Sequence, residues 1–202
     1  MKGVAIVQEK GGVGKTTLCH LLALGAAWNK VPAYLMHTDN RPPIQVTGRP
    51  YGYHDARNPS ALVTLIDSIV EEEGLCIIDG GGNRPDFDQW IASCVNLVIV
   101  PVTPDIEAVN IALAHRERLV CYGASNVQFL LNTVSNHQRE RARDNREYFR
   151  HIPDELILGR LGKVAAVKRL REDDKSNFVT PPTPVNNLAR KLFRLTNKEL
   201  QI

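Results

Sequence analysis

Residues 4–17 read VAIVQEKGGVGKTT, and this stretch decides the fold class. The run Val4 to Val7 is apolar and mostly β-branched, which predicts a buried strand. Three glycines follow within four residues, and an apolar helical pattern then runs from Thr16 to Asn29. A strand, a glycine-rich turn and a helix in direct succession form the context in which a phosphate-binding loop occurs.

The turn ends in Gly14-Lys15-Thr16-Thr17, which matches the end of a Walker A loop, with Glu9 where that loop usually has its first glycine. Glycines let backbone N–H groups close around phosphate oxygens. We expect Lys15 to contact the β- and γ-phosphates of ATP and the Thr16 hydroxyl to bind Mg²⁺. The expected nucleotide-binding residues of the loop are Gly11, Gly12, Val13, Gly14, Lys15, Thr16 and Thr17.

Apolar runs and helical patterns alternate along the rest of the chain. Further strands are expected at 33–36, 75–78, 97–100, 127–131 and 156–158, and the strand at 97–100 should stop at Pro101. Further helices are expected at 58–73, 86–93, 105–122, 139–150, 164–172 and 185–200. Strands that are apolar on both faces predict a three-layer α/β fold, with a mostly parallel, twisted sheet between helices. We expect one domain over 1–202 and ligand binding at the carboxyl ends of the strands.

The lysine before the glycines connects the loop with a known family. Residues Lys10 to Thr17 match K-G-G-x-G-K-[ST]-[ST], so the chain resembles the ParA/MinD family of deviant Walker A ATPases, closest to the small plasmid-partition proteins. In that family the first lysine, here Lys10, reaches the partner's nucleotide across a dimer interface. The resemblance implies the P-loop NTPase fold, an ATP-bound sandwich homodimer, and catalytic roles for Lys10 and Lys15.

The expected second strand ends in Met36-His37-Thr38-Asp39, where the family usually has D-x-D-P-Q. The resemblance implies that Asp39 is catalytic and orients the attacking water. His37 takes the place of the first aspartate, and Asn40-Arg41-Pro42 replaces the usual continuation. The alternative for Asp39 is an aspartate that only caps a turn.

Two further strand ends extend the resemblance. Asp79 and the glycines 80–82 follow the third strand, as in a Walker B strand, where a carboxylate holds Mg²⁺ through a water and the glycines approach the γ-phosphate. Asn132 ends the fifth strand, where the family's asparagine reads the adenine edge with its amide donor and acceptor. Residues 98–105 resemble the family's V-x-P-x-x-P signature, and 158–163 is the candidate for the other wall of the base pocket. The alternatives are an acidic strand end for Asp79 and a turn residue for Asn132.

Charge distribution suggests a second binding function. The chain carries a net charge of +3, but 139–171 alone holds ten basic and five acidic residues. Such a surface can bind DNA phosphates without reading sequence, although a solvated helix face with internal salt bridges is the alternative. The candidate DNA-binding residues are Lys163, Lys168, Arg169, Arg171, Arg190, Lys191 and Arg194.

The last expected helix carries a leucine stripe beside basic residues. We expect it to pack on the sheet, with a membrane-surface helix like the tail of MinD as the alternative. The start of the chain does not read as a signal peptide, and no apolar run is long enough to span a membrane. Cysteine pairs of the C-x-x-C type are absent, so the sequence indicates neither a disulfide framework nor a structural metal site. Three of the four cysteines, which are Cys19, Cys76, Cys94 and Cys121, lie in apolar surroundings, and we read the cysteines as reduced core residues.

The preferred interpretation is a ParA-type ATPase with ATP and Mg²⁺ as cofactors. We expect ATP to drive homodimerisation and the dimer to bind DNA non-specifically in plasmid partition. A centromere-binding or adaptor protein would stimulate an otherwise slow hydrolysis. The protein would then be cytoplasmic and nucleoid-associated in a bacterium. Two alternatives keep the same ATPase switch: conjugation or plasmid stability through protein contacts, and MinD-like positioning at a membrane.

Overall fold

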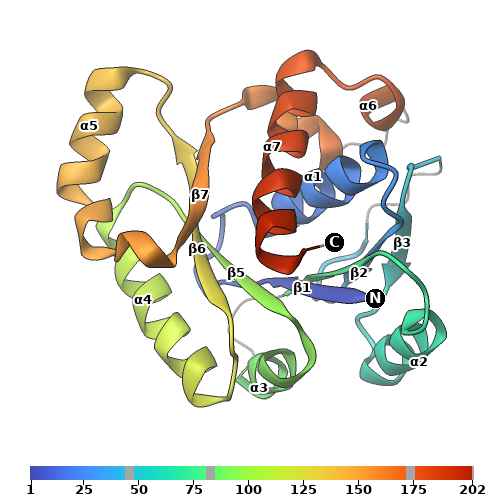
Figure 1. Ribbon diagram of the computed structural model, residues 1–202. Coiled ribbons are helices and arrows are strands. Elements are labelled where there is room, and N and C mark those ends of the chain that lie inside the picture. The colour runs from blue at the N-terminus through green and yellow to red at the C-terminus, as the bar shows by residue number, and fades with distance from the viewer. Residues whose placement is uncertain (44–47, 81–84, 172–175, 202) are drawn as a thin grey trace.

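Seven parallel strands form one sheet in the computed structural model, which describes residues 1–43, 48–80, 85–171 and 176–201 (Figure 1). The strand order is β3-β2-β4-β1-β5-β6-β7, which confirms the predicted parallel α/β sheet. The strands are β1 (Lys2–Ile6), β2 (Ala33–His37), β3 (Gly52–Asp55), β4 (Leu75–Asp79), β5 (Leu97–Val102), β6 (Val127–Val134) and β7 (Ile157–Gly162). The predicted Gly81 and Gly82 lie outside the described residues.

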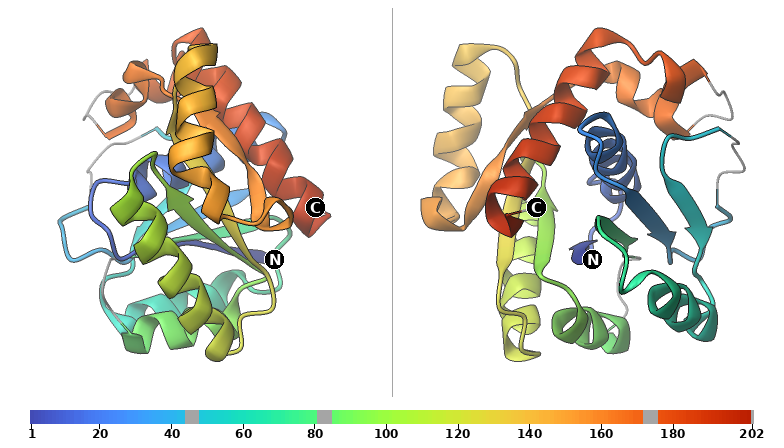
Figure 2. Two further views of the ribbon diagram at one scale, coloured as in Figure 1. Left: turned by 90° about the vertical axis from the view of Figure 1, so that its left-hand side faces the viewer. Right: turned by 45° about the vertical axis from the view of Figure 1, so that its right-hand side comes forward.

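Helices cover both faces of this sheet (Figures 1 and 2). Because successive strand residues point to opposite faces, Val4 and Ile6 join one core cluster and Ala5 joins the other. One face carries α1 (Lys15–Trp28), η3 (Ala165–Arg171), α6 (Ser176–Val179) and α7 (Thr183–Leu200). The other carries α2 (Pro59–Ile69), α3 (Pro85–Cys94) and α4 (Ile106–Cys121). The predicted three-layer arrangement is therefore confirmed.

The remaining helical segments lie at the β7 edge of the sheet. They are α5 (Gln138–Glu147) and the 3₁₀ turns η1 (Phe149–His151) and η2 (Asp154–Leu156). Figure 1 shows α5 standing outside the sheet, with β6 and β7 between it and the body of the molecule. Phe149 and Ile152 anchor this region in the core, whereas Asp144 is the one buried residue of α5. Helix α5 is therefore mostly a solvated helix.

Two strands differ from the prediction. Strand β5 continues through Pro101 to Val102. The pairing of β5 with β1 ends at Ile99, opposite Ile6, so Pro101 lies beyond the residues that pair with β1. Strand β3 was missed because its sequence, GYHD, has no apolar run. It pairs with β2 at the edge of the sheet.

The cysteine prediction was half wrong. Cys19 and Cys76 are buried, but Cys94 and Cys121 are exposed, and all four are free thiols. Cys94 and Cys121 are the last residues of α3 and α4, where the chain turns towards solvent. Helix α2 also ends earlier than predicted, at Ile69, ahead of the run of three glutamates at 71–73.

Helix α7 uses its apolar stripe inside the fold. Leu192 is fully buried, and Leu188 and Leu195 are partly buried against the same core. The helix crosses α1 so closely at Gly25 that an added Cβ there would lie 2.3 Å from the carbonyl oxygen of Ala189. The stripe is therefore not available for a membrane surface, and no helix in the described ranges is long and apolar enough to cross a bilayer.

Candidate nucleotide-binding site

The glycine-rich loop joins the carboxyl end of β1 to the first turn of α1. Gly12 and Gly14 have φ angles of 80° and 98°, a region that side-chain-bearing residues rarely adopt. Gly14 is the N-cap of α1, without a capping side chain, and the first turn contains no acidic residue. The N–H groups at this helix start, which lack partners within the helix, together with the helix dipole make the loop an anion site.

Lys15 lies in this loop with its ammonium group turned back along it. Its Nζ is 3.3 Å from the carbonyl oxygen of Lys10. Burial lowers the pKa of Lys15, while the carboxylates of Asp79 and Asp39 work in the opposite direction. A cation that is partly removed from water gains from an anionic partner such as a phosphate.

Asp79 lies at the end of β4, immediately beside the loop strand, and is 1% exposed. Its Oδ2 is 3.4 Å from His37 Nδ1, whereas its Oδ1 has no hydrogen-bond partner among the described residues. Thr38 fixes the same strand end, because its hydroxyl donates a 2.8 Å bond to the Asp79 carbonyl. A buried carboxylate oxygen without a donor fits a water bound to Mg²⁺, together with the Thr16 hydroxyl of α1.

His37 occupies the strand end next to Asp79, as the register of β2 and β4 requires. Its Nε2 lies 2.8 Å from the carbonyl oxygen of Arg41. Burial acts to lower the pKa of His37, but the Asp79 carboxylate and the Arg41 carbonyl outweigh it, and the pKa is raised. A group that gains a proton readily therefore stands where the ParA/MinD pattern has an aspartate.

Asp39 is partly exposed, two residues beyond the end of β2. Its Oδ1 accepts a hydrogen bond from the backbone N–H of Arg41 at 3.1 Å. The turn-capping alternative therefore describes a real contact of Asp39. It does not exclude the catalytic role, because the carboxylate also acts on the pKa of Lys15.

Lys10 is held inside its own subunit. Its Nζ lies 2.6 Å from Asp105 Oδ1 and 2.6 Å from Glu107 Oε2. These hydrogen bonds raise the pKa of Lys10. Asp105 is itself fixed as the N-cap of α4, accepting from the Ala108 N–H and the Thr103 hydroxyl, both at 2.8 Å. Sequence reasoning gave Lys10 no partner within the subunit, and the acidic residues at the start of the helix after β5 were the available signal.

Asn132 is 8% exposed, and its side-chain Nδ2 donates a 2.8 Å hydrogen bond to the Val13 carbonyl. A Cβ added to Gly14 would lie 2.7 Å from this nitrogen, so the Asn132 amide packs closely against the loop. The structure thus places Asn132 as a support of the loop, with one of its two amide N–H donors engaged. Its adenine contact stays a prediction.

A polar cavity of about 630 Å³ opens beside Asn132, between the ends of β6 and β7 and helix α5. Thr133, Asn136, Tyr148 and Lys163 line it. Asn136 Nδ2 donates to the Lys163 carbonyl at 3.1 Å, which joins the two strand ends. The predicted wall at 158–163 therefore reaches this cavity through Lys163.

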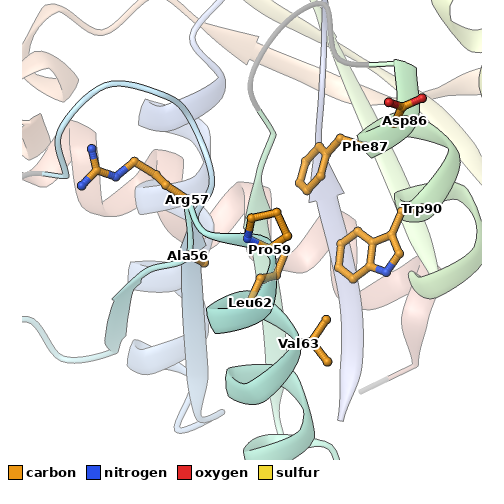
Figure 3. A pocket seen from close by; sticks show the side chains of 8 residues that line it. All are labelled: Ala56, Arg57, Pro59, Leu62, Val63, Asp86, Phe87 and Trp90. Atoms are coloured by element: carbon orange, nitrogen blue, oxygen red, sulfur yellow. The ribbon is translucent and has the colours of Figure 1, made fainter.

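An apolar groove of about 520 Å³ lies elsewhere, between α2 and α3. Figure 3 shows Phe87 and Trp90 of α3 facing Pro59 and Val63 of α2 across it. The two aromatic rings stack with centroids 5.7 Å apart. The predicted phosphate-binding residues do not line this groove, so it is separate from the predicted nucleotide site.

The basic residues of the second half divide between two places. Lys168 and Arg169 on η3 are exposed, and η3 packs against α1 and α7. Arg190, Lys191 and Arg194 are exposed on α7 itself, and Lys163 is exposed after β7. Helix α5, which carries further arginines, lies on the other side of β7 (Figures 1 and 2). The net positive charge of 139–171 is therefore not one surface. Of the predicted Arg171, only the backbone at the end of η3 is described.

No family model and no curated protein sequence matches the chain. Solved structures do match it. The MinC:MinD cell division protein complex of Aquifex aeolicus aligns over 98% of this chain and 96% of that one, with a TM-score of 0.74 and 14% identity. The septum site-determining protein MinD of Pyrococcus horikoshii, complexed with Mg-ADP, aligns over 100% and 99%, with a TM-score of 0.69 and 15% identity.

A plasmid partition protein of Borrelia burgdorferi, bound to AMPPNP, aligns over 98% of this chain and 99% of that one, with a TM-score of 0.71 and 13% identity. These three share the layered architecture of this chain along nearly their whole lengths. At such low identities the alignments establish architecture. The resemblance to the ParA/MinD family that the loop sequence indicated is therefore confirmed at the level of the fold: this chain has the fold of the ParA and MinD ATPases.

Proposed function

We propose that this chain is an ATPase of the ParA/MinD type, which binds ATP with Mg²⁺ at the glycine-rich loop and dimerises in the ATP-bound form. One observation carries the proposal. Asp79 ends β4 beside the strand that leads into the loop, Asp39 follows the end of β2, and Lys15 begins α1 after two positive-φ glycines. Two of the similar structures hold a nucleotide, Mg-ADP in one and AMPPNP in the other.

The residues divide the work of phosphoryl transfer. The loop N–H groups and Lys15 would bind the phosphates, and Thr16 with a water on Asp79 would hold Mg²⁺. Bound Mg²⁺ neutralises charge on the β- and γ-phosphate oxygens. Asp39 would orient the attacking water, with its side chain held by the Arg41 N–H. The cavity beside Asn132 has the volume and polar lining for the base.

Lys10 is the residue that supports dimerisation in the proposed function. A lysine within the subunit is already available at the phosphates, namely Lys15, so a second one is useful only where a partner's nucleotide faces it. Leaving Asp105 and Glu107 costs little, because the three side chains are 23%, 42% and 72% exposed and such pairs contribute about 0–1 kcal/mol. Lys10 can therefore exchange two carboxylates for a partner's phosphates.

The test is the mass of the protein in solution. Light scattering of the full chain with ATP and Mg²⁺, in a variant that does not hydrolyse, should give twice the mass seen with ADP. A parent that binds ATP yet stays monomeric would remove the dimer and leave a P-loop ATPase. A parent that binds neither nucleotide would remove the proposed function altogether.

DNA binding is the second part of the proposal, and we assign it to η3 and α7. Their exposed cations, Lys168 and Arg169 on one element and Lys191 and Arg194 on the other, lie on packed neighbours. Helix α5 has as many arginines but intersperses carboxylates, and Arg143 lies within 4.0 Å of both Asp144 and Glu147. Phosphates would therefore compete with these carboxylates for Arg143 on α5.

A matched pair of variants tests this assignment. Lys168→Glu with Lys191→Glu should make the negative slope of log affinity against log salt shallower by roughly 1.8, about 0.9 for each DNA phosphate that is no longer neutralised. The control, Arg139→Glu with Arg141→Glu on α5, should bind DNA nearly as the parent does. If only the control loses affinity, the DNA surface is on α5.

We further propose plasmid partition as the process served, with a centromere-binding or adaptor protein as the stimulating partner and the nucleoid as location. The Borrelia protein is the support for partition, and the MinC:MinD complex is the support for a protein partner. Conjugation or plasmid stability would use the same switch. Neighbouring genes discriminate: a small DNA-binding gene with upstream repeats favours partition, and a relaxase operon favours conjugation.

A further inference from the structure

Three side chains from three elements meet beside the start of the glycine-rich loop. Glu9 directly precedes Lys10, Asp88 lies in the first turn of α3, and His115 lies in α4. One carboxylate oxygen or ring nitrogen from each of them lies within 4.8 Å of the other two. None of these residues belongs to the phosphate or Mg²⁺ site described above.

Two of the three side chains are buried, and each has a hydrogen-bond partner, within the described part of the chain, for only one of its two polar atoms. Asp88 is 3% exposed and His115 is 1% exposed, and His115 Nε2 lies 2.9 Å from Asp88 Oδ2. Asp88 Oδ1 and His115 Nδ1 have no hydrogen-bond partner among the described residues. A buried carboxylate is costly unless both oxygens face donors or cations, so one shared proton leaves this pair undercompensated.

Glu9 is the third member of the cluster and lies on its solvent-exposed side. Its side chain is 28% exposed, and its Oε1 pairs with Arg118, whose side chain is 43% exposed. Arg118 can turn into solvent at small cost, because exposed ion pairs contribute about 0–1 kcal/mol. An ion therefore has an approach to Asp88 and His115 from the Glu9 side.

We propose that Glu9, Asp88 and His115 bind a divalent transition-metal ion of the Zn²⁺ class. One imidazole with two carboxylates is a ligand set that such ions accept, whereas Mg²⁺ and Ca²⁺ prefer oxygen ligands alone. Two ligand atoms at about 2.1 Å from one ion lie about 3.0–3.4 Å apart. The 2.9 Å between His115 Nε2 and Asp88 Oδ2 is close to that, so the ion would replace the proton they share.

The ion would connect three parts of the proposed switch. It would join the residue before Lys10 to α3, which follows the Asp79 strand, and to α4, whose first turn holds Lys10. Both oxygens of Asp88 would then face the ion, and Glu9 would reach the ion by rotation of its side chain. Because no nucleotide takes part, binding is expected whether or not the proposed ATPase function holds.

The experiment is a Co²⁺ titration of the metal-stripped full chain without nucleotide or Mg²⁺, followed by competition with Zn²⁺. We expect one equivalent of Co²⁺, visible d–d absorption without an intense thiolate band, and displacement by Zn²⁺. Asp88→Asn and His115→Gln should each weaken binding about tenfold or more. The controls Asp86→Asn and His151→Gln change exposed residues of the same types and should bind as the parent does.

Three results would overturn the proposal: no stoichiometric binding by the parent, unchanged affinity in the ligand variants, or a thiolate band that moves the ion to a cysteine. Variants of the two buried residues risk misfolding, so circular dichroism accompanies each titration. Glu9→Gln changes a partly exposed side chain and keeps its size. Its affinity should also fall about tenfold, and a folded Glu9→Gln protein that binds like the parent contradicts the three-ligand site.

Discussion

The two sides of the glycine-rich loop are built differently. On the side of β2 and β4, Asp79 ends a strand, Lys15 begins a helix, and Asp39 follows β2 with its side chain held by the Arg41 N–H. On the side of α4, Lys10 is held only by side-chain pairs with Asp105 and Glu107. Backbone-fixed groups are ready for phosphate, whereas side-chain pairs can exchange partners. The first side suits nucleotide chemistry and the second suits a switch.

The largest effect is expected at Asp39. Asp39→Ala should leave ATP binding within a few-fold of the parent and lower turnover about 1000-fold, since a positioned base contributes about 10²- to 10⁴-fold. Single-turnover hydrolysis of labelled ATP measures it. Asp39→Asn separates the two roles, because the amide oxygen retains the turn cap. Recovery of turnover in the asparagine variant would mean that the cap, and not the carboxylate, matters.

Lys15→Gln tests the cation on the same side of the loop. A charge-assisted hydrogen bond contributes about 1.5–3 kcal/mol, so ATP affinity should fall about 100-fold. Isothermal titration calorimetry with ATP and Mg²⁺ measures the affinity, and circular dichroism controls for folding. Affinity within a few-fold of the parent would exclude the loop as the phosphate site.

Lys10→Ala should affect only the switch side. We expect ADP affinity within about twofold of the parent and ATP-dependent dimerisation weakened about tenfold or more, since the variant removes a charged group from the interface. Light scattering over a concentration series measures dimerisation, with the exposed Lys2→Ala as control. A loss of ADP binding equal to that of Lys15→Gln would erase the distinction between the two sides.

The smallest effect on dimerisation is expected when Lys10 loses one of its carboxylate partners within the subunit. Glu107→Gln removes one of its two anionic partners without touching the α4 N-cap, and exposed pairs contribute at most about 1 kcal/mol. Dimerisation with ATP should therefore strengthen by a factor of about two to five. Glu117→Gln, exposed on the same helix, is the control. Weaker dimerisation in Glu107→Gln would show that the glutamate supports the dimer instead of restraining Lys10.

The sequence alone determined the layered α/β architecture and the loop, because the patterns that predict both are local. A run such as Val4 to Val7 predicts a buried strand, and glycines before Lys15 and Thr16 predict a phosphate loop. The sequence did not predict edge strand β3, because a short polar strand has no apolar pattern. It also did not predict that β5 continues through Pro101, because whether a strand tolerates proline depends on where the pairing with the neighbouring strand ends.

Only the tertiary structure decided which distant side chains meet. The pairing of Lys10 with Asp105 and Glu107, the support of the loop by Asn132, and the cluster of Glu9, Asp88 and His115 join residues far apart in the chain. Parallel strands bring their carboxyl ends to one edge, but helix packing sets which side chains come within hydrogen-bonding distance there. The sequence also did not decide where the leucine stripe of α7 packs, since an apolar helix face fits a sheet or a membrane. The contact of α7 with α1 shows that the stripe packs inside the fold.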